Sequence, residues 1–551
     1  MTGDRQLTLR AAVTGMVLGG VLALSNLYVV LKTGWSLGVT ITATIVAFGL
    51  FRALQLAGGT RRPFTALENA MVASIASSGA WMTGGGNMAA LPALLLLTGA
   101  RPSGWAMVAW FALIASLGVV VAMPLREQFI TREKLPFPMS VATAEAIRAM
   151  HGTGDTRPAK RLLGASVAAA LLTLWRDVKW SLALPGRLTF APLSTWSFGL
   201  DASLVLLGGG SLMKPRTAWS MLLGALVTWG IVAPLAVARG VVGAEFKAMV
   251  QLTLWPAAAL LASSALVGFA LQAARALRHG GAGGALPSPR LGLVFLALAA
   301  PLVVLMRWLF DIPLWMGVAS LPLAVLVGVI GARVTGETDV TPTKAMGPLT
   351  QLVFGVALPA NVTANVMGAN VTAGVGLHAA DLLSDLKTGE VLGADVKKQT
   401  WAQFLGIVVG ALAVVPAFLL LVPDASVLGS ESFPAPAVMV WAGVSKVLAT
   451  GLGGLPGGAR EAMLVAAALG AALVLLEARL GPERSRWLPS ASALGIAMVL
   501  PAATSLTMFT GAMLGVLARR RFSQDTLTPI ASGLIAGESV TGVVLALSRV
   551  L

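Results

Sequence analysis

Long apolar runs alternate with short polar connections along nearly the whole chain. The first run, Ala11–Leu31, ends at a Lys-Thr-Gly sequence, and the second, Ser36–Leu54, is followed by a basic loop. An apolar run of about 20 residues is long enough to cross the hydrocarbon layer as a helix. The runs are continuous rather than alternating, which argues against a transmembrane β-barrel. The pattern predicts an all-α, polytopic transmembrane bundle of about 16 helices.

Glycine and proline interrupt several of these runs, so broken or re-entrant helices are expected. A basic, Gly- and Pro-rich stretch at 278–290 indicates a linker between an N-terminal transmembrane half, 1–277, and a C-terminal half, 291–551. Further helices are expected near 64–83, 87–97, 105–123, 162–175, 193–213, 216–238, 249–277, 291–310, 313–332, 348–376, 379–422, 436–451, 461–479, 490–519 and 527–550.

Short sequences recur in the two halves. Leu31–Gly38 and Leu386–Gly393 share six of eight positions, and Leu-Pro-Phe-Pro at 135–138 has an echo in Phe-Pro-Ala-Pro at 433–436. We interpret the shared Lys-Thr-Gly as the turn that leaves a helix in each half. Interrupted apolar segments at corresponding places in two halves point to a transporter's substrate site. Pro136, Phe137, Pro138 and Glu145 are therefore candidate cavity residues; packing elements at the interface are the alternative.

Composition supports the membrane assignment and narrows the chemistry. The chain has 551 residues, of which 56% are hydrophobic and 11% charged, against about 25% charged in an average soluble domain. The net charge of +16 fits a positive-inside bias of loops better than nucleic-acid binding. With no cysteine and three histidines, neither disulfides nor an intrinsic metal centre is expected. No cofactor is expected, and a homo-oligomer is compatible with the sequence.

An acidic face within an apolar region is the clearest candidate for chemistry. On a helix, His378, Asp381 and Asp385 fall within about 60° of one another. Ionisable groups in spanning segments usually face a cavity, a partner or a proton path. The two carboxylates are candidate proton carriers, and His378 could bind a cation. Alternatively, the segment is a solvated loop, or Lys387 neutralises the aspartates.

Other polar residues allow two interpretations each. Lys32 and Lys387 could contact substrate or extend from helix ends to the interface. Asn361, Asn365 and Asn370, placed on a helix that precedes the acidic face, could bind a polar substrate or join helices. Glu68 could couple protons or close a Thr65-x-x-Glu68 capping box. Glu337 and Asp339 could bind a cation or stabilise a helix start.

One motif favours a different class of protein. Gly34-Trp35-Ser36-Leu37-Gly38 matches the G-x-S-x-G nucleophile pattern, which makes an intramembrane enzyme, using Ser36 or the acidic cluster, the alternative function. That elbow needs a strand before it, whereas here it joins two apolar helices. The chain contains no Walker A sequence, so a secondary transporter is expected rather than an ATP-driven one.

Several motifs, in a fixed order, carry a family resemblance. The chain resembles the oligopeptide transporter superfamily, and its motifs are most similar to the yellow stripe-like, metal–chelate branch and its prokaryotic relatives. The matching stretches are Lys32–Gly34, Pro63–Thr65 with Glu68-Asn69, Lys134–Pro138 with Ala142–Ala144, Gly336–Asp339, Asp381–Gly389 and Pro529–Glu538.

The resemblance implies a proton-coupled symporter in the cell membrane. Its substrates are expected to be small oligopeptides or peptide-like metal chelates, with protons as the coupling ion and lipid as the other partner. Glu538 stands where the family usually has an acidic residue in its last helix, so the resemblance assigns it a coupling role. Met139-Ser140-Val141 replaces the usual Ser-Gly-Thr after the aromatic-Pro pair.

Overall fold

The computed structural model is almost entirely helical, which confirms the all-α, polytopic fold class. It describes residues 5–548 apart from 35, 37–38, 60–61, 85, 136, 154–155, 178–186, 190–192, 279–287, 339–340, 342, 360, 431–432 and 451–457. The strands described form one antiparallel hairpin, β1 (Arg187–Thr189) with β2 (Gly199–Asp201).

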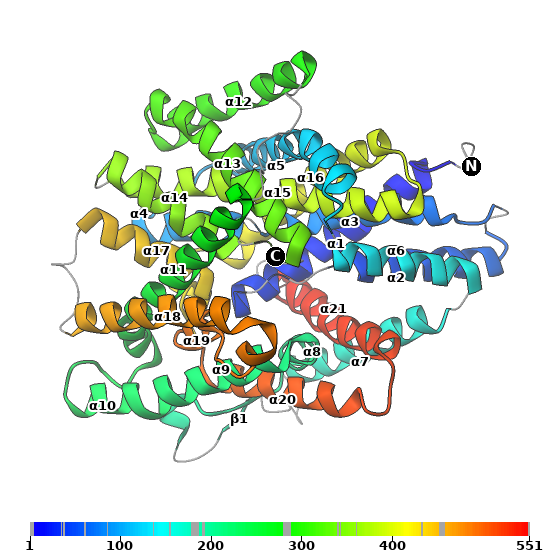
Figure 1. Ribbon diagram of the computed structural model, residues 1–551. Helices are drawn as coiled ribbons and strands as arrows, with labels where there is room; N and C mark the ends of the chain where they lie inside the picture. The colour runs from blue at the N-terminus through cyan, green and yellow to red at the C-terminus, as the bar shows by residue number, and fades with distance from the viewer. Residues whose placement is uncertain are drawn as a thin grey trace.

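The helices follow one another along the chain, and the β1–β2 hairpin lies between α7 and α8 (Figure 1). In the first part of the chain they are α1 (Leu9–Thr33), α2 (Thr40–Leu56), α3 (Ala66–Trp81), α4 (Asn87–Thr98), α5 (Gly104–Arg126), α6 (Pro138–Thr153), α7 (Arg157–Asp177), α8 (Leu204–Leu212), α9 (Pro215–Val227), α10 (Ala233–Ala238) and α11 (Phe246–Arg278). The others are α12 (Pro289–Phe310), α13 (Leu314–Thr338), α14 (Thr343–Ala357), α15 (Val362–Leu392), α16 (Val396–Leu421), α17 (Pro436–Thr450), α18 (Ala459–Ser485), α19 (Ala491–Ala497), α20 (Ala502–Ala518) and α21 (Gln524–Ser548).

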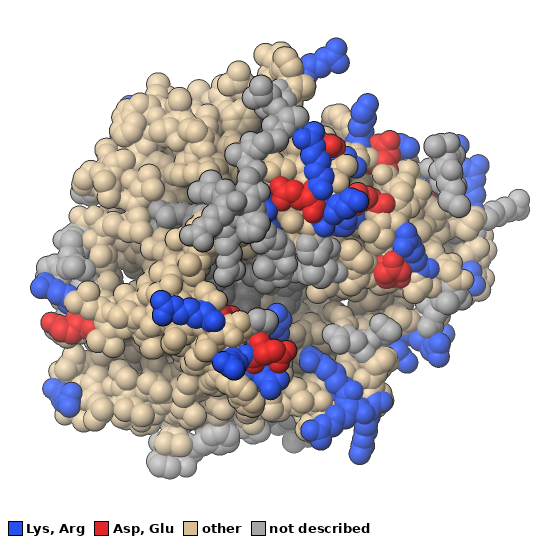
Figure 2. All heavy atoms as spheres, in the orientation of Figure 1, with Lys and Arg blue, Asp and Glu red and all other residues tan. Residues whose placement is uncertain are grey.

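Length and apolar composition suit many of these helices to a membrane. Among the described residues, eight helical runs are long and apolar enough to cross one. On α1 the side chains of Leu9, Val13, Val17 and Val21 are exposed at every fourth position, so one stripe of the helix faces outward. Figure 2 shows charged side chains in a few groups with wide uncharged areas between them. An apolar outer surface of this kind is what lipid contact requires.

The helices pack as two bundles, which Figure 1 shows one above the other. In the first bundle, α1–α6 pack with α12–α17; α15 lies against α3, α5 and α13. In the second bundle, α7 pairs with α21, α8 with α20 and α11 with α18. Each bundle thus takes helices from both predicted halves. The division into halves stays a prediction, and most of its linker, 279–287, lies outside the described residues.

Small residues let the backbones of α1, α3 and α16 approach closely. A Cβ atom placed on Gly406 of α16 would lie 2.2 Å from the Ile75 carbonyl oxygen of α3. A Cβ on Gly19 of α1 would lie 3.3 Å from the Ala76 Cα atom. Glycine at helix crossings is typical of membrane bundles, in which van der Waals packing drives association. This crossing positions the polar groups described below.

Three predicted helical segments have the wrong boundaries. The segments expected at 348–376 and 379–422 form three helices, because Asn361 caps α15 by accepting from the Ala364 backbone N–H and Gly393, at φ +80°, ends it. Asp395 then caps α16. The segment expected as a helix over 193–213 is helical mainly in α8, which begins after its cap, Ser203.

The two Lys-Thr-Gly sequences are not equivalent. Gly34 ends α1 in the left-handed region at φ +71°, as a helix C-cap commonly does. Gly389 lies inside α15, which continues to Leu392. The interpretation of the second copy as a turn leaving a helix is therefore wrong.

Candidate functional site

The central helix α15 carries the predicted acidic face. Its residues Ala364–Leu383 are all buried, because helices of the first bundle surround it. The expectation of a solvated loop at His378–Gly393 is therefore wrong for the acidic residues, which lie inside this helix. A polar helix becomes stable in a membrane only when other helices cover it and satisfy its side chains.

Asp381 and Asp385 are one helical turn apart and share a single amide. Nε2 of Gln403, on α16, lies 3.2 Å from an oxygen of each carboxylate. Ser77, on α3, donates its hydroxyl to the other Asp381 oxygen at 2.8 Å. Both carboxylates are buried. Their hydrogen-bond donors in the described structure are neutral, and neither residue forms an ion pair there.

The neighbours of the acidic pair do not neutralise it. Lys387 forms an ion pair with Glu390 at 2.7 Å, so the idea that it neutralises the aspartates receives no support from its contacts. His378, one turn before Asp381, is buried, and its Nε2 has no hydrogen-bond partner in the described part of the chain. A Cβ on Gly118 of α5 would lie 2.7 Å from the His378 Cβ, so α5 covers the histidine closely.

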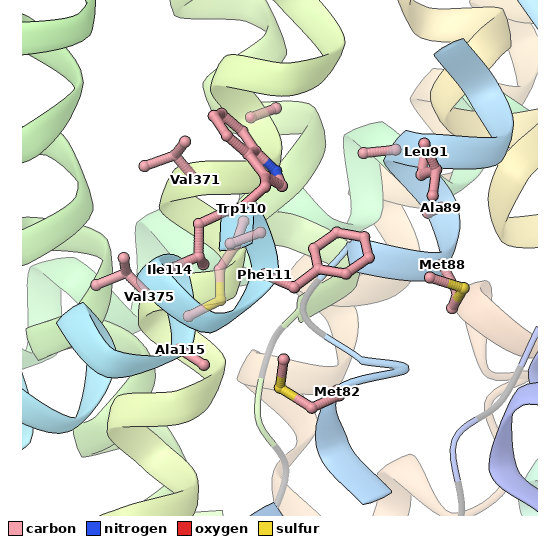
Figure 3. Packing of buried hydrophobic residues seen from close by; sticks show 14 of the residues in the cluster. Met82, Met88, Ala89, Leu91, Trp110, Phe111, Ile114, Ala115, Val371 and Val375 are labelled. Carbon is pink, nitrogen blue, oxygen red and sulfur yellow. The ribbon is translucent and has the colours of Figure 1, made fainter. Parts of the chain in front are cut away.

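Asn365 and Asn370 lie on α15 itself, not on a preceding helix, and Asn361 is the cap just before it, so each asparagine has a different role. Asn370 accepts a hydrogen bond from Trp110 Nε1 at 2.8 Å and donates to Asn87 at 2.9 Å, which links α15 to α5 and α4. Figure 3 shows Trp110 beside Val371 within this apolar packing. Asn361 is the helix cap, and Asn365 donates to the Gln351 carbonyl while its own oxygen has no partner among the described residues.

Glu68 closes a complete capping box at the start of α3. Its backbone N–H donates to the Thr65 hydroxyl, and its carboxylate accepts from the Thr65 backbone at 3.1 Å. The same carboxylate pairs with Arg10 of α1 at 2.5 Å. The Thr65-x-x-Glu68 signal therefore predicted the capping geometry correctly, and a proton-coupling role for Glu68 stays a prediction.

Glu538 is buried in the second bundle and well supplied with donors. The carboxylate accepts from Arg176 of α7 at 3.1 Å, from the Ser203 hydroxyl at 3.0 Å and from the Val205 backbone N–H at 2.8 Å. It thereby ties α21 to α7 and to the start of α8. Lys32, whose amine lies 3.4 Å from the Tyr28 hydroxyl, interacts electrostatically with both Glu538 and Arg176.

The predicted cavity segment forms a strained entry to α6. Phe137 is buried with φ +39°, and its N–H donates to the Gly336 carbonyl at the end of α13 at 2.8 Å. Pro138 begins α6, Pro136 lies outside the described residues, and Glu145 is exposed and paired with Arg148 at 2.8 Å. Across the molecule, Ala435 has φ +44° and donates to the Leu31 carbonyl at the end of α1 at 2.9 Å.

The described part of the structure does not bring the predicted cation-binding residues together. His378 lies within the first bundle, Glu337 is in the last turn of α13 with its side chain not described, and Asp339 lies outside the described residues. Within the described ranges, no group of three or more His, Cys, Asp or Glu side chains could hold a metal ion.

Several partners of these residues were missed from the sequence. Gln399 and Gln403 lie one turn apart on α16, which after Gln403 is entirely apolar. Both reach the acidic pair, and Gln399 donates to the Asp385 backbone carbonyl at 2.9 Å. Two amides at this spacing in a spanning helix are themselves a signal of a polar interior. Arg176 gives a similar signal near the end of α7.

A helical bundle with an apolar exterior and a polar central helix defines a polytopic membrane protein with a buried polar interior. The family model described as "OPT oligopeptide transporter protein" matches residues 6–280 and 288–549. The chain therefore belongs to the OPT oligopeptide transporter family, and it is a multi-pass membrane transporter. The enzyme alternative is accordingly set aside; Ser36 lies between α1 and α2, with no strand before it in the described chain.

Curated relatives cover the chain nearly end to end at low identity. A putative oligopeptide transporter of Saccharomyces cerevisiae is 24% identical over 98% of this chain and 95% of its own length. The iron-phytosiderophore transporter yellow stripe 1 of Zea mays is 24% identical over 97% of this chain and 89% of its own. A metal-nicotianamine transporter of Arabidopsis thaliana is 23% identical over 97% and 92%.

Proposed function

We propose that this transporter takes up small oligopeptides or peptide-like metal chelates across the cell membrane by symport with protons, which Asp381 and Asp385 carry. The substrate class is supported by the family and by the printed names of its relatives, which include peptide, phytosiderophore and nicotianamine transporters. The coupling ion is supported by the acidic pair on α15.

The main support for proton coupling is that the buried carboxylates of Asp381 and Asp385 share one neutral amide, that of Gln403. Two ionised carboxylates this close, away from water, repel each other strongly, so one of them holds a proton or a counter-ion. Gln403 can donate to either carboxylate, which keeps the pair in place while its charge changes. A gain or loss of one proton is thus the least costly change of charge at this point.

Glu538 is a weaker choice for the proton carrier. Its carboxylate already faces the cationic Arg176 at 3.1 Å and two further donors, so the ionised form is compensated where it stands. Protonating it would remove the negative charge that this carboxylate places beside the buried arginine. The acidic pair on α15 has no such cation among its described contacts.

The test is uptake by proteoliposomes with purified protein. We expect accumulation of di- or tripeptides or of a ferric chelate to rise when the outside is acidified and to collapse with a protonophore. Asp381→Asn and Asp385→Asn keep the side-chain shape and remove the ionisable group. Each variant should lose accumulation driven by the proton gradient and keep exchange of labelled for unlabelled substrate at equal pH.

Asp395→Asn is the matched control. Asp395 is an exposed cap of α16, ten residues from Asp385 in the chain, and asparagine caps a helix as well as aspartate does. This variant should transport like the wild type. Uptake that ignores the proton gradient, or that remains proton-driven in both α15 variants, would overturn the assignment of the coupling residues.

A further inference from the structure

A line of hydrogen-bonded hydroxyl groups leads from the start of α2 to the acidic pair. Thr40, the first residue of α2, donates its hydroxyl to the Ser77 hydroxyl of α3 at 3.3 Å. Ser77 in turn donates to Oδ1 of Asp381 on α15 at 2.8 Å. Helix α3 packs against both α2 and α15. Three neighbouring helices thus contribute one group each to the line.

The line begins at a partly exposed residue and ends at a buried one. Ser77 and Asp381 are buried, whereas Thr40 is only partly buried. The next residues on the same side of α2, Ala43 and Thr44, are fully buried. The exposure of Thr40 therefore belongs to the end of the helix. A proton that arrives at this end has two hydroxyl groups to pass before it meets a carboxylate.

The direction of the line follows from the chemistry of its last member. An ionised carboxylate can only accept, so Ser77 must donate to Asp381, and the Ser77 oxygen is left to accept from Thr40. A threonine hydroxyl in a helix often donates to a carbonyl of the preceding turn, as Thr44 does to Ile41 at 2.7 Å. Thr40, with no preceding turn in α2, donates to another helix instead.

The line reaches one member of the acidic pair and not the other. Asp381 accepts from Ser77 at Oδ1 and from Gln403 at Oδ2. Asp385 forms a hydrogen bond with a different serine of α3, Ser74. Ser74 is buried, and its further described partner is the buried Gln399 amide at 3.4 Å. Among the described contacts, only the Asp381 side of the pair is therefore connected to a partly exposed hydroxyl.

The other titratable groups near Asp381 do not offer an entry of this kind. Asp385 and His378 lie one turn away on α15, and both are buried. From α3 and α16 the described contacts of Asp381 are Ser77 and Gln403, which do not titrate in this range. Charged residues on the helices around α15 have ion-pair partners elsewhere: Glu68 of α3 with Arg10, Glu145 of α6 with Arg148, and Arg333 of α13 with Glu133.

We propose that Thr40 and Ser77 relay the coupling proton to Asp381, which makes Asp381 the member of the pair that the proton reaches first. A hydronium ion at the start of α2 gives a proton to the Thr40 oxygen and becomes water. The original Thr40 proton passes to Ser77, and the original Ser77 proton passes to Asp381. Both hydroxyls end neutral, and the carboxylate becomes a neutral carboxyl group. The inference rests on the proposed function, and it adds the route by which the coupling ion enters.

The test is the pH dependence of uptake by proteoliposomes with the full-length protein. The probe is labelled dialanine or iron–nicotianamine, whichever the wild type takes up. Thr40→Val keeps the side-chain shape and removes the hydroxyl. If proton entry slows at least about 10-fold, a more acidic outside is needed for the same rate. The midpoint of acid activation should then move to lower pH by at least about one unit.

Four further variants show whether the hydroxyl itself matters. Thr40→Ser keeps the hydroxyl and should keep the wild-type midpoint. Thr44→Val is the matched control, because the Thr44 hydroxyl donates within its own helix; its midpoint should also be that of the wild type. Ser77→Ala should shift the midpoint as Thr40→Val does. The double variant of Thr40→Val with Ser77→Ala should shift it no further than Ser77→Ala alone, because groups in series act as a unit.

The outcomes separate the relay from the proposed function. A Thr40→Val variant with a lower maximum rate and the wild-type midpoint would show that Thr40 only packs, and would overturn the relay. An equal shift in Thr44→Val, or a lost shift confined to packing and restored by no hydroxyl in Thr40→Ser, would do the same. Wild-type uptake that ignores pH would overturn the coupling proposal and the relay together. Proton-driven uptake in the wild type, abolished in the α15 variants but unmoved in Thr40→Val, would overturn the relay alone.

Discussion

Replacing Glu538 with glutamine distinguishes a structural ion pair from a coupling residue. The Arg176 side chain is 10% exposed and the Glu538 side chain is fully buried. Removing the charge of one partner of a buried pair weakens the electrostatic compensation of the other, at a cost of up to roughly 3–5 kcal/mol. The glutamine amide would also place an NH₂ group among donors such as the Val205 N–H, which in the wild type donates to the Glu538 carboxylate at 2.8 Å. We expect the free energy of unfolding to fall by about that amount.

The assay is denaturant unfolding of the purified protein, followed by tryptophan fluorescence. Glu145→Gln is the control, because Glu145 and Arg148 form an exposed pair, with 59% and 50% of their side chains accessible. An exposed pair contributes about 0–1 kcal/mol. The double variant Arg176→Met with Glu538→Gln should recover part of the loss, since it also removes the buried positive charge.

One result would refute this reasoning. If Glu538→Gln unfolds like the wild type while proton-driven uptake is lost, the carboxylate is a coupling residue and its contacts with Arg176 and Ser203 are of secondary importance. If unfolding is destabilised and uptake per folded molecule remains proton-driven, Glu538 is a clamp that joins α21, α7 and α8.

Two further substitutions test the packing of the first bundle. Gly406→Ala should destabilise the fold by about 1–3 kcal/mol, because the new methyl group would lie 2.2 Å from the Ile75 carbonyl oxygen. Gly209→Ala is the control: nothing lies within 4 Å of its new methyl group, so the free energy of unfolding should be unchanged or slightly higher. Equal unfolding midpoints for the two variants would contradict the close helix crossing. Trp110→Phe should lower the free energy of unfolding by about 1–3 kcal/mol, because it leaves the buried Asn370 oxygen without its donor. The control Trp105→Phe, at a residue that is 77% exposed, should not change the free energy of unfolding. A similar loss in both variants would refute the role of the hydrogen bond.

Local patterns predicted local geometry well. The apolar runs indicated spanning helices, and Thr65-x-x-Glu68 indicated the start of α3, because both signals arise within one segment. The spacing of His378, Asp381 and Asp385 placed them on one helical face, which α15 confirms. The predicted boundary between α14 and α15 was wrong. The break there depends on the cap Asn361, which in the sequence looks like the other asparagines, Asn365 and Asn370, that follow inside the helix.

The partners of the acidic pair could not be read in the same way. Ser77 and Gln403 reach Asp381 from positions 304 and 22 residues away in the chain, so no local pattern connects them. The argument that singled out the carboxylates also applies to amides, because an amide in an apolar spanning helix needs a hydrogen-bond partner. Applied to Gln399, Gln403 and Gln351, that argument indicates three further polar contacts of the bundle interior, though not which helices meet there.

Of the two sequence repeats, the proline-containing pair at 135–138 and 433–436 corresponds to a shared backbone geometry, and the Lys-Thr-Gly pair does not. Phe137 and Ala435 each precede a proline, adopt positive φ and donate to a carbonyl two residues before the end of another helix, α13 and α1 respectively. Positive φ costs a non-glycine residue of order 1–3 kcal/mol, so the surrounding structure must hold each one. These reciprocal contacts make the end of α13 at Thr338, and not Lys387-Thr388-Gly389, the structural counterpart of the end of α1 at Thr33. A reciprocal pair of contacts between helix ends is what the predicted duplication would produce, although the duplication itself stays a prediction.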